Sequence, residues 1–293
     1  MARQQGEAIL FELLRSFTML AETLNLSRTV ERLGTTRQTV RRHLVILEEH
    51  MGGPLFELVD REYQLTERGR NALREAEELL ARGDAWLRNQ SGHIDGRYFL
   101  RSNNATDQKY FLEQQPLRQL WTVDAPLLQE SVRAWAEAKG ELEHAVFAPI
   151  RPYIMVFRLH GEDWLCTHVG EKSSFATWFG WEWERSMIGR GLVDFPGGRG
   201  FARLMTQPFR EVYETEGLRL DHILTHIPRD PDGPPAPIAY RRLLLGCRFP
   251  DSSFALVSVV DRTHNLKIEG VERSDIEAMP EDLVMSINPL EAA

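Results

Sequence analysis

The first 90 residues show helical periodicity that is interrupted at short intervals. Apolar residues recur every three or four positions, and this spacing predicts an amphipathic helix over residues 7–25. The apolar positions are Ile9, Leu13, Phe17, Leu20 and Leu24. Ser27 then stands where the N-cap of a second, shorter helix is expected, and that helix should end at Leu33.

Gly34 is well placed to end this short helix, because the residue after a helix often needs a positive φ. Thr35 or Thr36 can cap the next helix, whose apolar positions are Val40, Leu44 and Leu47. Two helices joined by a tight glycine turn predict a helix-turn-helix, whose second helix can enter the major groove of DNA. The alternative is a plain helical hairpin with a solvated basic face.

The next segments predict a hairpin and a long helix. Residues 54–69, "PLFELVDREYQLTERG", place strand-forming residues on both sides of the polar turn "VDRE", which is typical of a wing. Residues 66–90 read as one helix with an apolar seam repeating at coiled-coil spacing, which predicts a dimer contact. The alternative is a helix folded back on its own domain. The seam residues expected at the contact are Leu73, Ala76, Leu80 and Leu87.

The arginines of this region are concentrated on the predicted helix-turn-helix. Residues 27–42 hold five arginines and one acid, although the whole chain has a formal net charge of -8. Arg37 and Arg41 lie one helical turn apart on one face, where each can bond a guanine edge. Arg28 and Arg42 are expected to contact phosphates. The overall acidity argues against a protein that coats nucleic acid generally.

These features resemble the DNA-binding domain of LysR-type transcriptional regulators over about residues 1–90. The resemblance is carried by Leu33, Thr36, Val40, Leu47-Glu48, Met51-Gly52, Leu55-Phe56, Leu65-Thr66 and Gly69. It implies a winged helix-turn-helix over residues 1–65, with Thr36 and Gln38 also facing DNA, and a dimerising linker helix over 66–90. Arg37, Gln38 and Arg41 depart from the family's usual residues, so no operator sequence can be carried over.

The remaining residues predict a different fold. Residues 91–152 read as a polar connector with one helix, residues 153–265 as strands, short helices, a longer helix and strands, and residues 266–293 as a tail. This order resembles a PAS domain, as does the segment around Gly180, Glu184, Ile188-Gly189-Arg190 and Asp194. The fold class expected is therefore α+β, a winged helix-turn-helix and linker helix followed by a PAS-like antiparallel sheet with flanking helices. A GAF domain and a degenerate two-lobed LysR effector domain remain as alternatives.

A PAS-like fold implies a hollow between sheet and helices that a small organic effector can occupy. The side chains expected around it are Phe175, Trp178, Trp183, Phe201, Met205 and Tyr240. Histidines such as His222 and His226 are more often structural than axial ligands, which disfavours haem. The rival interpretation is a dimerisation or protein-interaction module with no ligand.

Composition narrows the class of protein further. The hydrophobic fraction of 42% and the charged fraction of 27% are typical of a soluble globular protein. No signal peptide or membrane-spanning run is recognised, and two cysteines are too few for a disulfide framework, which favours the cytoplasm. No catalytic motif or metal-ligand spacing stands out. The sequence thus predicts a non-enzymatic cytoplasmic regulator that binds double-stranded DNA as a homodimer or higher homo-oligomer, with no membrane partner.

Overall fold

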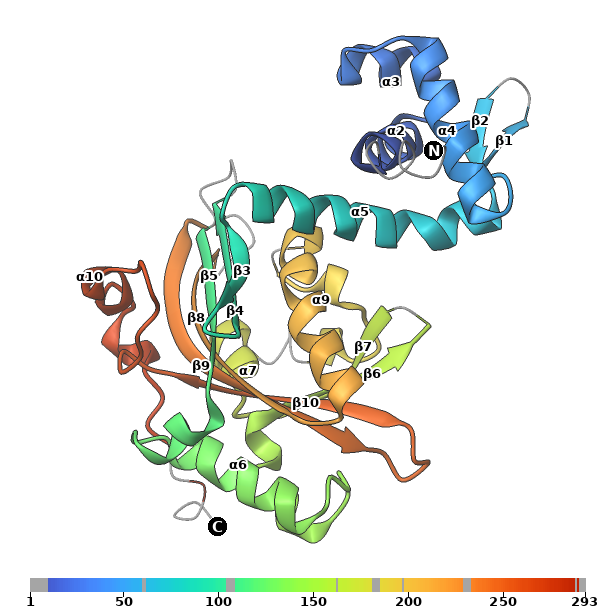
Figure 1. Ribbon diagram of the computed structural model, residues 1–293. Coiled ribbons are helices and arrows are strands. Elements are labelled where there is room, and N and C mark those ends of the chain that lie inside the picture. Colours follow the sequence, from blue (N-terminus) through green and yellow to red (C-terminus); the bar gives the residue numbers. More distant parts are fainter. Residues whose placement is uncertain are drawn as a thin grey trace. The chain divides into compact units, whose positions relative to one another are not determined.

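The chain divides in the computed structural model into residues 1–89 (the first unit) and residues 90–293 (the second unit), both drawn in Figure 1. The structure describes residues 10–59, 62–103, 109–161, 163–180, 185–196, 198–228, 233–287 and 289, and for 103, 199–201, 203 and 204 it describes the backbone alone.

The first unit contains the helices that the periodicity predicts. The amphipathic helix is α2 (Leu10–Thr23), and the two helices after it are α3 (Leu26–Leu33) and α4 (Arg37–Met51). The strands β1 (Phe56–Val59) and β2 (Glu62–Leu65) pair antiparallel, and the long helix α5 (Glu67–Leu87) follows. Asp60 and Arg61, in the expected turn, lie outside the described residues.

One hydrophobic cluster holds the first unit together. It includes most of the predicted apolar faces of α2 and α4, together with Leu55, Phe56 and Ala76. Burying a leucine or phenylalanine side chain of this kind contributes roughly 1.5–3 kcal/mol. The predicted face of α4 and the central part of that of α2 are therefore confirmed as core. Leu24, at the end of the predicted first face, is 44% exposed, and Ile9 lies outside the described residues.

Helix α5 packs against its own unit along the apolar stripe that was predicted from its coiled-coil spacing. A Cβ atom on Gly69 would lie 2.1 Å from the carbonyl oxygen of Leu55, and one on Gly83 would lie 2.4 Å from the ring of Phe11. Both glycines therefore permit a close approach that any larger residue would obstruct. The seam residues Leu73 and Leu80 pack against the cluster of the first unit, in which Ala76 is buried.

The second unit is built on one eight-stranded antiparallel sheet. Its strand order is β3-β4-β5-β8-β9-β10-β6-β7. The five predicted strands of residues 153–261 are all present, as β6 to β10. The strands are β3 (Ser91–Ile94), β4 (Arg97–Asn103), β5 (Lys109–Gln115), β6 (Ile154–His160), β7 (Asp163–Val169), β8 (Leu218–Pro228), β9 (Pro235–Arg248) and β10 (Phe254–Arg262).

Two expectations about the second unit are wrong. Residues 91–103 and 109–115, expected as part of a polar connector, contain β3, β4 and β5, and β5 pairs with β8 inside the sheet. The turn between β3 and β4 is Asp95-Gly96, with φ values of 50° and 76°, a two-residue hairpin signal that the polar neighbours obscured. The expected tail after residue 265 contains α10 (Arg273–Glu277), and its Ile276 and Leu283 are buried in the core.

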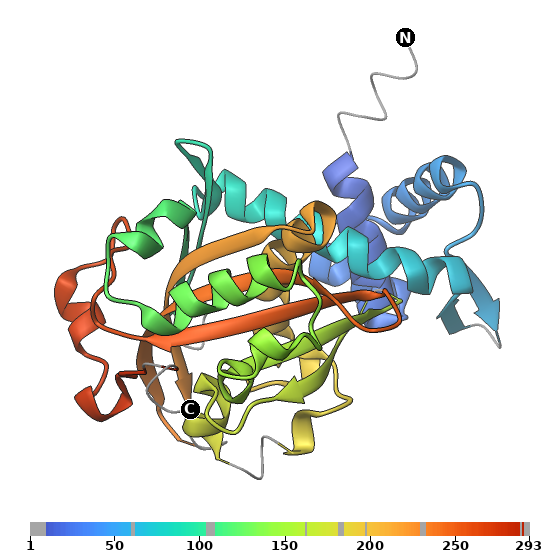
Figure 2. The same cartoon turned by 90° about the horizontal axis from the view of Figure 1, so that it is seen from below.

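Helices cover both faces of this sheet, as Figures 1 and 2 show. Helix α6 (Pro126–Glu137) packs on β9 and β10 from one side, over a core that includes Leu127, Leu243 and Val257. Helix α9 (Gly198–Thr215) packs on β8, β9 and β10 from the other, with α7 (Ser174–Phe179) beside β10. This second face carries the cavity and the buried charges described below.

Candidate functional site

The helices of the helix-turn-helix have capping residues at their ends on both sides of the turn. Asn25, rather than Ser27, is the N-cap of α3, because its side chain accepts hydrogen bonds from the backbone N–H groups of Ser27 and Arg28 at 3.0 and 3.2 Å. Gly34 ends α3 with a φ of 61°. Thr36 caps α4 by accepting from the Thr39 N–H at 3.1 Å. The predicted glycine turn and the Thr36 cap are thus confirmed, and the Ser27 cap is wrong.

The outer face of α3 and α4 is cationic. Arg28, Arg37, Arg41 and Arg42 are all exposed, as is Gln38. None of these four arginines forms an ion pair with another residue in the part of the chain that the structure describes. Their positive charge is therefore not neutralised within the first unit.

Two arginines of this region, Arg32 and Arg37, have contacts of their own within the first unit. Arg32 forms an ion pair with Glu22 of α2, so its charge is compensated locally. Arg37 donates a hydrogen bond from Nη2 to the Ser27 hydroxyl at 2.7 Å. This bond links the start of the second helix to the start of the first and holds the Arg37 guanidinium beside α3.

A histidine anchors the inner face of α4. His43 is 6% exposed, and its Nδ1 lies 2.8 Å from the hydroxyl of Ser16 on α2. Burial, assisted by the charge of Arg42, lowers the pKa of His43 from its usual 6.5. The helix that presents the arginines is therefore fixed to α2 through a histidine that favours its neutral form.

Most of the residues expected at a dimer contact pack instead against their own unit. Leu73, Ala76 and Leu80 contact the core of their own unit, whereas Leu87 is 69% exposed. The seam spacing alone could not tell whether α5 packs on the core of its own unit or on a second copy of the chain, since both contacts need the same apolar stripe. The other large apolar side chains that α5 exposes are Leu79 and Trp86, at 43% and 68%.

A cavity of about 120 Å³ lies in the second unit between the sheet and the helices α7 and α9. Phe175, Trp178, Met205 and Tyr240, four of the six side chains expected around a hollow, line it. Trp183 lies outside the described residues, and Phe201 falls in α9 where only the backbone is described. Lining residues that the sequence did not single out include Met155, Phe195, Phe209, Arg242 and Ser258.

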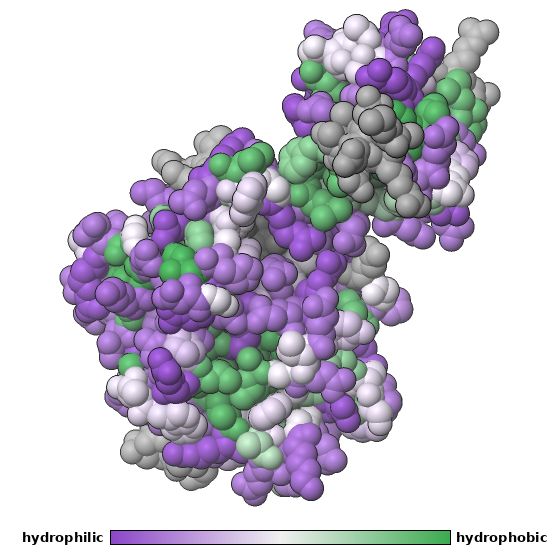
Figure 3. All heavy atoms as spheres, viewed as in Figure 1, coloured by the Kyte–Doolittle hydropathy of each residue, from purple (hydrophilic) through white to green (hydrophobic). Residues whose placement is uncertain are grey.

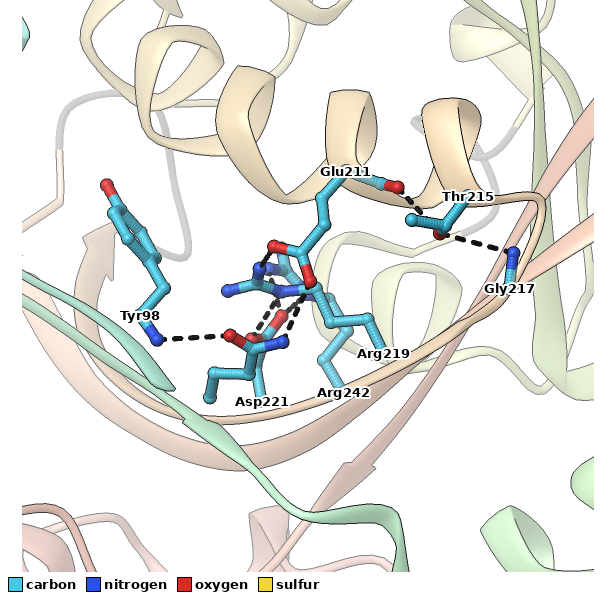
Figure 4. Close-up of polar contacts among 8 residues, drawn as sticks. Tyr98, Glu211, Thr215, Gly217, Arg219, Asp221 and Arg242 are labelled. Atoms are coloured by element: carbon cyan, nitrogen blue, oxygen red, sulfur yellow. Dashed lines mark hydrogen bonds and ion pairs between the residues drawn. The ribbon is translucent and has the colours of Figure 1, made fainter. Parts of the chain in front are cut away.

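Beside the cavity, four charged side chains form a buried network that sequence reasoning missed (Figure 4). Asp221 accepts from Arg219 Nε at 2.8 Å and from Arg242 Nη2 at 2.7 Å. Arg219 also pairs with Glu211 of α9, and Gln114 of β5 donates to the same carboxylate at 2.8 Å. The three strands β5, β8 and β9 are thereby tied to α9.

The charges of this network balance one another. Two guanidinium groups face two carboxylates, and Arg219, Asp221 and Arg242 are each at most 2% exposed. Burial alone would lower the pKa of Arg242, but the adjacent Asp221 outweighs it and raises that pKa. The sequence did carry a signal for this network, because Arg219, Asp221 and Arg242 stand within strands whose other residues are mostly apolar.

Of the two histidines weighed as haem ligands, His222 is held by the fold, whereas the buried Nδ1 of His226 has no hydrogen-bond partner among the described residues. His222 is 3% exposed, its Nδ1 lies 2.9 Å from the Lys267 carbonyl oxygen, and burial lowers its pKa. Burial also raises the pKa of the Cys166 and Cys247 thiols to about 12. Among the described residues, no group of three histidine, cysteine or acidic side chains is placed to hold a metal ion.

The surface of the second unit is mainly hydrophilic on the face shown in Figure 3, with hydrophobic residues gathered in separate patches. No described helix is both long and apolar enough to span a membrane.

Comparison with known proteins finds a family match within the first unit. Residues 11–70 match the model described as "Bacterial regulatory helix-turn-helix protein, lysR family". This span covers α2, α3, α4, the β1–β2 hairpin and the beginning of α5. Residues 11–70 are therefore similar to the helix-turn-helix domain of the lysR family.

Curated relatives align with the same part of the chain. The HTH-type transcriptional regulator IlvR of Caulobacter vibrioides is 41% identical over 71 residues, which is 24% of each chain. The HTH-type transcriptional regulator DgdR of Burkholderia cepacia is 34% identical over 83 residues, which is 28% of each chain. The chain thus spans about a quarter of the length of these relatives.

Solved structures match a similar share of this chain. The DNA-binding domain of BenM in complex with catB site 1 DNA is 26% identical, over 28% of this chain and 98% of that one, with a TM-score of 0.26. CbnR, a LysR family transcriptional regulator, is 29% identical over 27% of this chain and 29% of that one, with a TM-score of 0.25.

Proposed function

We propose that this protein is a transcriptional regulator that binds specific double-stranded DNA through α4 of its first unit. The observation that carries the proposal is the cluster of four exposed, unneutralised arginines on a capped helix-turn-helix of the lysR type. Guanidinium groups suit both parts of this task, because they bond guanine edges bidentately and also pair with phosphates. The β1–β2 hairpin acts as the wing.

The assignments within the interface follow from position. Arg37, Gln38 and Arg41 lie on the first turns of α4, so they read base edges, as the N-terminal residues of a recognition helix do. Arg28 near the start of α3 and Arg42 contact phosphates. Thr36 caps α4 through its hydroxyl and approaches the DNA with the helix N-terminus.

The regulator acts as a homodimer joined through α5. The exposed apolar side chains Leu79, Trp86 and Leu87 support this, since they gather toward the C-terminal half of that helix. The seam residues Leu73, Ala76 and Leu80 hold α5 against its own unit and do not form the dimer contact. A two-fold dimer would read two related half-sites.

The second unit senses a small molecule through a PAS-like fold. Support comes from the element order β6-β7-α7-α9-β8-β9-β10, with these strands arranged in the sheet as β8-β9-β10-β6-β7. The cavity between this sheet and its helices supplies room for an effector. One continuous antiparallel sheet favours this interpretation over a degenerate two-lobed domain. The β3–β5 strands extend the sheet beyond the PAS-like part.

Sequencing the DNA that the purified chain retains from a random library tests the proposal. We expect enrichment of a site with two related halves, and loss of that enrichment for the double variant Arg37→Ala, Arg41→Ala. The double variant Arg74→Ala, Arg82→Ala on α5 removes the same charge elsewhere in the first unit and should retain the motif. Failure of the unaltered chain to enrich any motif would overturn the assignment.

A further inference from the structure

We propose that the cavity of the second unit binds an uncharged ligand built on one aromatic ring with a hydrogen-bond-accepting oxygen, and that Trp178 donates to that oxygen. This inference rests on the sensing role proposed above, because it names the chemical class of the effector. Four properties of the cavity carry it: its size, the character of its walls, its charge balance and a buried donor.

Size restricts the ligand to a single ring. The cavity measures about 120 Å³. An apolar cavity of roughly 150 Å³ in another protein takes up benzene, so this cavity is too small for a fused ring system or a sugar with its hydration shell. A six-membered ring with one small substituent is the matching size.

The walls favour an aromatic ring over an aliphatic one. Phe175 lines the cavity and contacts two further lining rings, Phe179 at 4.9 Å and Phe195 at 5.3 Å between centroids, with interplanar angles of 49° and 56°. Rings prefer such tilted arrangements at these separations, because the edge of one ring meets the face of another. An aromatic ligand can continue the same pattern, and Met155 and Met205 add polarisable, adaptable surface.

Charge balance excludes an anionic ligand. Arg242 is the cationic side chain on the cavity wall, and its guanidinium already donates to Asp221 at 2.7 Å and contacts the Met205 sulfur. Arg219 and Glu211 complete a network with equal numbers of positive and negative groups. A carboxylate entering this site would lose its hydration without meeting an uncompensated positive charge, which is strongly unfavourable.

The remaining clue is an indole N–H that has no partner. Trp178 lines the cavity and is 4% exposed, and its Nε1 is buried without a hydrogen-bond acceptor among the residues that the structure describes. A buried donor of this kind is costly unless something accepts from it, and indole is a donor only. A neutral ligand oxygen satisfies it, whereas a purely hydrocarbon ligand leaves it unsatisfied.

Phenol and toluene test this proposal directly, because they differ only in a hydroxyl against a methyl group. Calorimetric titration of the full chain should show phenol binding about tenfold more tightly than toluene, a ratio that corresponds to one hydrogen bond. Benzoate at the same concentrations should not bind measurably. In Trp178→Phe, which keeps a ring and removes the donor, the ratio of phenol to toluene affinity should fall to near one.

Trp164→Phe is the matched control, since Trp164 is equally buried at 4% but does not line the cavity. It should leave the ratio unchanged. A second variant, Ser258→Leu, fills the cavity from β10 and should abolish binding of both ligands while circular dichroism shows an intact fold. This variant keeps the proposal testable if Trp178→Phe fails to fold.

Four outcomes would overturn the inference: no binding of either neutral ligand, equal affinity of phenol and toluene for the unaltered chain, a ratio retained in Trp178→Phe, or benzoate binding as tightly as phenol. The DNA-enrichment experiment is performed without any ligand, so the two proposals fail separately. A chain that enriches a DNA motif but binds no phenol remains a regulator with a differently filled cavity. A chain that binds phenol but enriches no DNA keeps the ligand site and loses the assigned function.

Discussion

Asp221 and Arg242 form an ion pair across two neighbouring central strands, with 2.7 Å between Asp221 Oδ2 and Arg242 Nη2 and with both side chains at most 2% exposed. The same carboxylate binds Arg219, which reaches Glu211 on α9. Helix α9 also forms one wall of the cavity through Met205 and Phe209. A single carboxylate thus connects the sheet to the helix that encloses the candidate ligand site.

Replacing this carboxylate should destabilise the second unit strongly. Asp221→Asn leaves two buried guanidinium groups facing one carboxylate, and losing one partner of a buried ion pair costs about 3–5 kcal/mol. Six of the seven tryptophans lie beyond residue 90, so tryptophan fluorescence during denaturant unfolding reports mainly on this unit. Asp251→Asn is the control, because it breaks an exposed pair with Arg158 and should change the midpoint little. Equal midpoints for both variants would contradict the structural role of the network.

Substitutions on the helix-turn-helix should separate base reading from phosphate binding. Arg37→Ala and Arg41→Ala should each weaken binding to the enriched site by about 1–3 kcal/mol and relax discrimination at one position. Arg28→Ala should weaken all sequences alike and lower the slope of log affinity against log salt by about one. Fluorescence anisotropy over a salt series measures both effects. If Arg37→Ala and Arg41→Ala bind that site as tightly as the unaltered chain, α4 is not the reading helix.

Association should depend on the exposed end of α5. The double variant Trp86→Glu, Leu87→Glu places charge on two apolar side chains that are 68% and 69% exposed, so it should weaken the proposed dimer without removing core contacts. Sedimentation velocity over a concentration series measures the change. Trp121→Glu, on a half-exposed tryptophan of the second unit, is the control and should leave association unchanged. A double variant that stays fully dimeric would place the dimer contact on another surface.

The glycines of α5 should respond differently to the same substitution. Alanine is favoured over glycine inside a helix by about 1 kcal/mol, so Gly→Ala stabilises a helix that has room for the methyl group. Gly69→Ala should destabilise the first unit, because its Cβ would lie 2.1 Å from the backbone oxygen of Leu55. Gly83→Ala meets only the ring of Phe11, which is 38% exposed and can turn away, so its penalty should be smaller. Scanning calorimetry gives the two transition temperatures, and an upward shift for Gly69→Ala would refute the packing of α5.

Acidification should loosen the first unit through His43. Because the pKa of His43 is lowered in the folded state, the unfolded chain takes up the proton first as the pH falls. The contribution of His43 is therefore present above pH 6.5 and is lost as the pH decreases below that value. His43→Leu should reduce the fall in stability between pH 7 and 5, while His50→Leu, on an exposed side chain of the same helix, should not. An unchanged pH dependence in His43→Leu would show that this histidine stays solvated.

Much of the first unit was predictable because its signals are local. The spacing of Leu13, Phe17 and Leu20 sets the buried face of α2, and Gly34 and Thr36 set the turn within a few residues of themselves. A cap or a left-handed glycine needs only its neighbours in the chain. The misplaced cap shows the limit of this reasoning: Asn25 and Ser27 are both suitable residues, and the side chain that reaches the free N–H groups depends on where α2 ends.

The strands of residues 153–261 were likewise predictable from runs of β-forming residues, whereas their neighbours in the sheet were not. Residues 91–103 and 109–115 were expected within a polar connector, since their strands bury one face in short alternations such as Tyr110 and Leu112. The pairing of β5 with β8, more than a hundred residues later in the chain, joins these strands to the core. Pairing over such a separation leaves no local signal.

The sequence by itself determined the helices of the first unit, the strands of residues 153–261, where the helix-turn-helix lies, and that its surface is rich in arginine. Tertiary structure decided the partner of each apolar or charged face: the seam of α5 meets its own unit, and Asp221, Arg219, Arg242 and Glu211 meet beneath α9. The physical reason is that an apolar stripe or a buried charge specifies the kind of surface it needs and not its position in the chain. That position is fixed only when distant segments fold together.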